Sequence, residues 1–157
     1  MKNNIIVLGR ADNKLKTYAK EVAFNCLKFM NQPTDLEVVI EFVSEAEIKR
    51  LNNELRGIDR VTDVLSFPAT NLKVGDFFDK NNEQVVFEND GAFHFGDMAL
   101  CIKRLREQAK EFGETPKQEL KKLVIHSMLH LMGYDHIKDS DYEIMNKKEI
   151  EMDRLIK

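Results

Sequence analysis

The sequence contains few cysteines and no long apolar segment. Cys26 and Cys101 are the two cysteines among 157 residues, and both lie within apolar segments. We therefore expect buried thiols and no disulfide framework. No apolar run approaches the roughly 20 residues of a membrane-spanning helix, and the apolar stretch at residues 5–8 is too short for a signal peptide. These absences predict a cytoplasmic protein that does not associate with a membrane.

A strong excess of charge of either sign is also lacking. The formal net charge is −3, and 43% of the residues are hydrophobic and 32% charged, as in an ordinary soluble globular protein. The balance gives no general sign of nucleic-acid binding. Lysines and arginines within residues 103–110 and 117–122 could still form a local basic surface. A solvated helix face balanced by neighbouring glutamates is an equally good interpretation.

The pattern of apolar residues predicts an α+β fold. Strands are expected at residues 5–8, 37–43, 60–68 and 93–102. Helices are expected at residues 15–30, 44–55, 103–112, 116–132 and from 140 to the C-terminus. The length fits one domain, residues 1–157. We expect a mixed sheet of about four strands covered by about five helices.

Two local features add detail to this predicted fold: helix caps and one long polar segment. Ser44 with Glu47, Thr115 with Gln118, and Ser140 with Glu143 have the spacing of capping boxes that open helices. Residues 69–92 form a long polar segment, which we expect to be partly ordered, with a small hairpin around residues 85–87. A loop of this length in a compact domain is usually functional or disordered.

Three of the four histidines occur within eleven residues, at His126, His130 and His136. The first two are separated by one helical turn, so their imidazoles leave the same face of the predicted helix. Gly133 provides a left-handed residue that ends the helix and can bring His136 back towards the other two. Three neutral imidazoles make an open zinc site with one position left for water, which is typical of metal-assisted hydrolysis.

The same spacing occurs in metzincin peptidases, but those enzymes require glutamate directly after the first histidine. This chain has Ser127 at that position. A serine hydroxyl cannot act as the general base that a carboxylate provides at neutral pH. Ordinary peptidase chemistry is therefore disfavoured.

Taken together, the motifs resemble those of the YbeY family of bacterial endoribonucleases, which are rRNA maturation factors. The segment from His126 to His136 is similar to the family's H-G-x-L-H-L-x-G-Y-D-H. Residues 51–68 resemble N-x-x-x-R-x-x-D-x-P-T-D-V-L-S-F-P, and residues 96–101 resemble its G-D strand. The similarity covers most of the chain from about Asp35 onward. The departures are Ser127 in place of glycine and Val61 in place of proline, and neither affects a histidine.

The resemblance implies a zinc-dependent endoribonuclease that acts on single-stranded rRNA. It implies a role in maturation of the 3′ end of 16S rRNA and in ribosome biogenesis or quality control. The small ribosomal subunit and assembly factors would be its partners. One Zn²⁺ per chain would be held by His126, His130 and His136, although imidazoles also accept Ni²⁺.

Arg56 is the arginine of the second motif, and we expect it to be catalytic and to bind the phosphate, because guanidinium matches phosphate in a bidentate fashion. An exposed arginine at a helix end is the alternative. Ser66 is a candidate substrate-binding residue, or else a structural serine in a strand. Asp97 and Asp135 could each orient a histidine or cap a turn.

Two other functions stay open at this stage. The chain could be a ribosome-assembly factor that binds RNA or protein and in which the metal is chiefly structural. It could also be a zinc hydrolase of another class, such as an amidase or atypical peptidase. His94, outside the motif, is expected to be a surface histidine with its hydrogen bonds satisfied.

Overall fold

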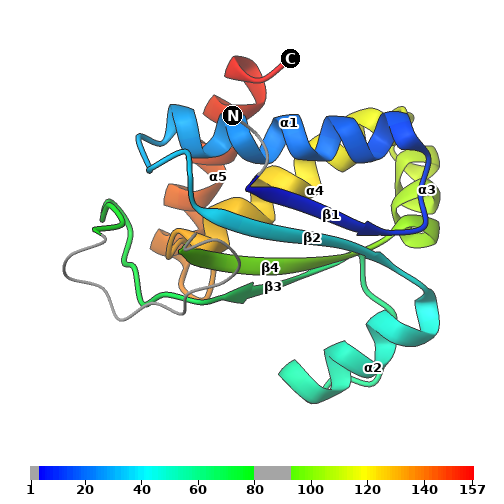
Figure 1. Ribbon diagram of the computed structural model, residues 1–157. Coiled ribbons are helices and arrows are strands. Elements are labelled where there is room, and N and C mark those ends of the chain that lie inside the picture. The colour runs from blue at the N-terminus through cyan, green and yellow to red at the C-terminus, as the bar shows by residue number, and fades with distance from the viewer. Residues whose placement is uncertain (1–3, 80–92) are drawn as a thin grey trace.

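The computed structural model describes residues 4–79 and 93–157. In these residues, four strands and five helices follow one another along the chain (Figure 1): β1 (Ile5–Gly9), α1 (Asn13–Phe29), β2 (Glu37–Val43), α2 (Glu45–Arg56), β3 (Val64–Pro68), β4 (His94–Cys101), α3 (Ile102–Glu111), α4 (Pro116–Leu131) and α5 (Asp139–Leu155). This confirms the predicted α+β fold with a four-stranded mixed sheet and five helices.

The sheet has the order β1-β2-β4-β3. The first three of these strands are parallel, and β3 pairs antiparallel with β4 at the edge. Side chains alternate between the two faces of a strand. Ser66 of β3 therefore points to the face covered by α4, whereas Leu65 points to the opposite face and packs with Ile48 of α2.

Helix α4 is the centre of the main core. Nine of its sixteen residues are buried, and it packs against α1, α3, α5 and the sheet. Figure 1 shows α2 projecting from the other side of β3, away from α1. Burying apolar surface is worth about 25 cal/mol per Å², so the many-sided burial of α4 holds its backbone firmly in place.

The predicted element boundaries hold to within two residues except at the start of β3, and one predicted helix cap is absent. Strand β3 begins at Val64 and not at residue 60, because the Asp63 carboxylate accepts a hydrogen bond from the Val64 N–H and Asn52 binds the Arg60 carbonyl. These contacts keep residues 60–63 in a loop. Helix α5 begins at Asp139 after Lys138, with no side-chain cap, so the predicted capping box at Ser140 was wrong.

The described part of the predicted polar loop packs onto the domain. Leu72 and Phe78 are buried, and the Gln32 side chain accepts from the Phe78 N–H and donates to the Asp76 carbonyl. The hairpin predicted around residues 85–87 lies outside the described residues. Residues 69–79 therefore belong to the fold and are not a peripheral addition.

The structure also bears on the cysteines and on the lack of a long apolar segment. Both cysteines are free and buried, as predicted, and burial raises the pKa of the Cys26 thiol well above its usual range. In the part of the chain that the structure describes, no helix is both long and apolar enough to cross a bilayer.

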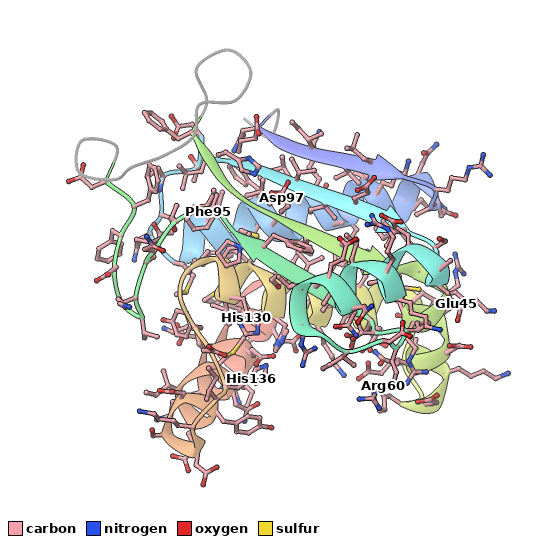
Figure 2. All side chains as sticks on the ribbon, turned by 90° about the horizontal axis from the view of Figure 1, so that it is seen from below. Glu45, Arg60, Phe95, Asp97, His130 and His136 are labelled. Carbon is pink, nitrogen blue, oxygen red and sulfur yellow. The ribbon has the colours of Figure 1, made fainter. Side chains whose placement is uncertain are left out.

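His94 is buried between two carboxylates, so the expected surface position was wrong, although its hydrogen bonds are satisfied. Its Nδ1 lies 2.8 Å from Glu37 Oε1 and its Nε2 lies 2.7 Å from Asp97 Oδ2. The hydrogen bond to Asp97, opposed by burial and reinforced by Glu37, raises the pKa of His94 to about 9. The Asp97 carboxylate therefore bonds His94 on its own strand, β4, and lies away from His130 and His136 (Figure 2).

We predict that this trio makes stability depend on pH. An unfolded histidine has a pKa of about 6.5, so the stabilisation from protonated His94 is complete below that pH and is lost as pH rises through about 9. In urea unfolding, His94→Gln should therefore lower the free energy of unfolding most at pH 6 and least at pH 10. A deficit that stays constant across this range would contradict the assignment.

Candidate metal centre

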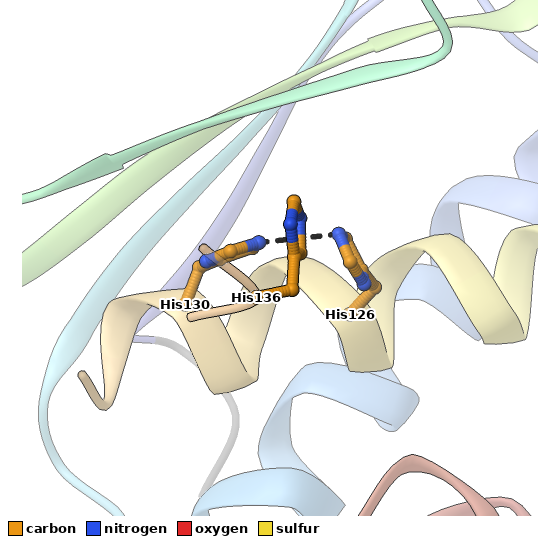
Figure 3. Close-up of side chains that lie close together, drawn as sticks. All are labelled: His126, His130 and His136. Atoms are coloured by element: carbon orange, nitrogen blue, oxygen red, sulfur yellow. Dashed lines mark hydrogen bonds between the residues drawn. The ribbon is translucent and has the colours of Figure 1, made fainter. Parts of the chain in front are cut away.

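Helix α4 places two histidines on consecutive turns. The helix begins in a capping box formed by Thr115 and Gln118 and has Pro116 at its first turn, as the sequence predicted. Near its other end, His126 and His130 lie on the same side of the helix with their rings pointing toward one another (Figure 3), and their Nε2 atoms lie 3.2 Å apart. Because α4 is buried on its other sides, the backbone positions of these two histidines are held by the packing of the helix.

The turn after α4 brings in the third histidine. Gly133 adopts a left-handed conformation with φ of 96°, its N–H donates to the His130 carbonyl, and the Tyr134 N–H donates to the Leu129 carbonyl. This pair of hydrogen bonds is a Schellman motif, and it confirms the predicted role of Gly133. His136 follows it, and its backbone N–H donates to Asp135 Oδ1.

Gly133 is also required because the chain passes very close to another segment. A Cβ at this position would lie 2.2 Å from the carbonyl oxygen of Leu72. The loop that follows β3 therefore packs directly on the turn that carries His136. No side chain larger than hydrogen can occupy this contact without moving one of the two backbones.

The three imidazoles fit one metal ion. One ligand atom from each histidine lies within 4.8 Å of the other two, and His136 stacks on His126 with ring centroids 5.6 Å apart. Nitrogens bound to one tetrahedral zinc ion at 2.0–2.1 Å lie roughly 3.3 Å apart, close to the 3.2 Å between His126 and His130. Among the described residues, no cysteine or carboxylate joins the group, which corresponds to an open site with three protein ligands.

The surroundings favour the neutral form of His130 that metal binding requires. Burial, together with the neighbouring His126 and His136, lowers the pKa of His130 to about 4. The imidazole is therefore unprotonated at neutral pH and has a lone pair available. A metal ion need not displace a proton from this residue.

A cavity of about 380 Å³ opens beside the histidines. Its lining comes from the end of α2, from β3, from α4 and from the turn after α4: Leu55, Arg56, Val64, Leu65, Ser66, Pro68, His126, His130, Asp135, His136 and Ile137. The structure thus brings all five predicted site residues to one cavity. Leu55 and Ile137 are exposed apolar side chains at its rim, and no pattern in the sequence marks them as site residues.

Arg56 is the last residue of α2, and Gly57 ends the helix in a left-handed conformation with φ of 69°. The Arg56 side chain is exposed and forms no ion pair with any residue in the described ranges. A guanidinium that lines a cavity and has no carboxylate partner can bind an anion there.

Ser66 lines the same cavity and has a hydrogen-bond partner that is distant in the sequence. Its Oγ lies 2.7 Å from the Oγ of Ser127, which is fully buried in α4. Ser127 is the residue that departs from the glycine of the family motif. The bond joins β3 to the helix that carries His126 and His130. The sequence showed both serines but could not show that they meet.

The other polar candidates lie elsewhere or act locally. Asp97 binds His94, and Asp135 accepts from the backbone of His136, so neither contacts an imidazole of the three-histidine group. Four of the seven basic side chains of residues 103–122 are ion-paired: Lys103 with Glu45, Arg104 with Glu107 and Glu111, Lys121 with Asp153, and Lys122 with Glu114. This arrangement favours the solvated helix face over a basic binding surface.

The chain is similar in sequence and in fold to known proteins. Residues 3–156 match the model of the family described as Endoribonuclease YbeY. A Clostridium acetobutylicum protein of that name is 39% identical over 145 residues, covering 90% of this chain and 87% of the relative. The Finegoldia magna protein of the same name is 41% identical over 138 residues, covering 88% and 80%. A solution structure of a Thermotoga maritima protein aligns with TM-score 0.62 and 34% identity, covering 97% and 88%.

We predict that Gly133→Ala weakens both the fold and metal binding. Gly113→Ala is a matched control, because Gly113 also has a positive φ of 66° but has open space around the added Cβ. The left-handed conformation should cost each variant about 1 kcal/mol. Displacing Leu72 should cost Gly133→Ala roughly 1–3 kcal/mol more. Urea unfolding and metal titration of both variants measure the difference, and equal losses would contradict the close contact.

We also predict that Ser66 and Ser127 are energetically coupled. Each of Ser66→Ala and Ser127→Ala should lower the free energy of unfolding by about 1 kcal/mol, because each leaves one hydroxyl without its partner. In a double-mutant cycle the double variant should lose less than the sum of the two. Purely additive losses would show that the two hydroxyls do not interact in solution.

Proposed function

The chain belongs to the endoribonuclease YbeY family, and from this we propose that it is a zinc-dependent endoribonuclease that cuts single-stranded rRNA. We further propose that it acts in the cytoplasm in maturation of the 3′ end of 16S rRNA and in ribosome biogenesis or quality control, with the small ribosomal subunit and assembly factors as its partners. The whole chain, residues 1–157, would form one hydrolase domain. The observation that carries the proposal is the convergence on one cavity of three imidazoles and of an arginine that has no carboxylate partner among residues 4–79 and 93–157.

We assign the metal ligands to His126, His130 and His136. Zinc, when bound, supplies the hydrolytic chemistry, because it lowers the pKa of water to about 7 and provides hydroxide without a carboxylate base. This would compensate for Ser127 at the position where metzincin peptidases have glutamate. The low pKa of His130 supports its role as a ligand.

We assign the binding of the scissile phosphate to Arg56. A phosphodiester is anionic and gains charge as it is attacked, so a fixed cation beside the metal stabilises the transition state. Arg56 lines the cavity and has no carboxylate partner in the described residues. Its fork of N–H groups can donate two parallel hydrogen bonds to phosphate oxygens.

We assign a supporting role in substrate binding to Ser66. Its hydroxyl is half-buried at the cavity and is bonded to Ser127. When Ser127 donates this bond, the Ser66 proton is free to point into the cavity, where a phosphate oxygen can accept it. The pair would thus hold a donor at a fixed position in the cavity that Arg56 also lines.

We predict distinct losses for the metal and phosphate residues. With a single-stranded rRNA fragment as substrate, His130→Ala should lose bound zinc and cleavage together. Arg56→Ala should retain zinc and lose a factor of about 10²–10³ in kcat, as expected when a fixed transition-state donor is removed. Cleavage assays with zinc analysis of the same samples measure both effects.

Arg10→Ala is the matched control, because Arg10 is exposed and follows β1, the strand at the opposite edge of the sheet from β3. It should cleave like the wild type. If all four proteins cut alike, the activity comes from a contaminant. If the wild type binds zinc and cuts no RNA, the proposal gives way to an assembly factor with a structural metal.

A further inference from the structure

One of the three histidines has a carboxylate behind it. The Nε2 of His126 faces His130, and its other ring nitrogen, Nδ1, lies 3.4 Å from Oε2 of Glu149 on α5. This separation is a few tenths of an ångström longer than an N–H···O hydrogen bond. A small rotation of either side chain closes the gap. Glu149 lies outside every motif found in the sequence.

The packing of α5 explains how Glu149 reaches this position. Met145 and Met152 are buried in the core, and residues 145, 149 and 152 share one face of a helix because they are separated by four and three positions. The same face packs against α4. Lys121 of α4 then fastens the end of α5 by donating to the carbonyls of Asp153 and Ile156.

Glu149 has no competing ionic partner in the part of the chain that the structure describes. The neighbouring lysines of α4 and α5 pair with other carboxylates, Lys122 with Glu114 and Lys148 with Glu151. The side chains of His126 and Glu149 are 29% and 32% exposed. Partial burial reduces solvent screening, so the contact is more effective than one on the open surface.

The position of Glu149 excludes a role as a fourth ligand of the same ion. It lies beside Nδ1, whereas the Nε2 atoms of His126 and His130 meet on the other edge of the imidazole. The ring therefore separates the carboxylate from the point where the three histidines converge.

We propose that Glu149 is a positioning residue that accepts the Nδ1–H of His126 and thereby directs the Nε2 lone pair to the metal. A neutral imidazole carries its proton on one nitrogen, and a hydrogen bond at the other end determines which. Carboxylates that hold a ligating histidine in this way raise its basicity and fix its ring orientation. The inference rests on the proposed metal site, and it makes α5 part of that site.

The test compares two substitutions at Glu149 with the same substitutions at Glu143, an exposed glutamate of the same helix. Zinc affinity is measured by competition with a chromophoric chelator. Glu149→Ala should bind zinc 10- to 100-fold more weakly than the wild type. Glu149→Gln keeps an acceptor oxygen and should lose less, and Glu143→Ala and Glu143→Gln should bind like the wild type. If Glu149→Ala does not fold, Glu149→Gln provides the comparison.

A second measurement on the metal-free protein separates this inference from the proposed function. At pH 8, ¹⁵N spectra of the His126 ring should show the proton on Nδ1 in the wild type and a shift towards Nε2 in Glu149→Ala. Wild-type zinc affinity together with an unchanged tautomer in the Glu149 variants would overturn the inference. Failure of the wild type to bind zinc would instead overturn the proposed function, and the tautomer would still report on Glu149.

Discussion

The many-sided burial of α4 is the constraint on which the site depends. The helix packs against α1, α3, α5 and the sheet, and most of its residues are buried. Only a narrow stripe remains open, and at the C-terminal end this stripe consists of His126 and His130. Since the backbone beneath them is held by the core, the two imidazoles lose little freedom when they bind a common ligand. Most of the conformational entropy needed to organise the site is therefore lost when the protein folds and not when a ligand binds.

The third histidine depends on a contact between distant parts of the chain. Gly133 ends α4 in a Schellman motif and lies directly against the Leu72 carbonyl. The loop after β3 thus supports the turn that carries His136. Buried Leu72 and Phe78 anchor this loop in the core, so a segment that is polar in composition contributes to the geometry of the metal centre.

Strand β3 joins the two sides of the cavity. Through Ser66 it contacts Ser127 on α4, and through Leu65 it packs with α2, whose last residue is Arg56. The alternation of side chains along one edge strand therefore connects the histidine helix and the arginine helix. This arrangement places a cation beside a three-imidazole site, which suits an anionic phosphodiester better than a neutral peptide bond.

Much of the fold and the core of the site could be predicted because the signals are local. Helical spacing places His126 and His130 on one face, a glycine after a helix predicts the left-handed turn before His136, and Thr115-Pro116 predicts the start of α4. Local patterns also misled. Ser140 and Glu143 have capping-box spacing, yet α5 begins after Lys138 without a side-chain cap. Residues 60–63 have a strand-like sequence but are held as a loop by Asn52 and Asp63.

The amino-acid sequence by itself determined the elements, the histidine spacing and the family motifs, because these depend on neighbours within a few turns of chain. Tertiary structure alone decided which side chains meet. It buried His94 between Glu37 and Asp97, paired Ser66 with Ser127, and brought Glu149 of α5 to the far side of His126. Each of these contacts joins residues more than 20 positions apart, except that of His94 with Asp97. Such contacts are set by how helices and strands pack, and no periodicity in the sequence records that packing.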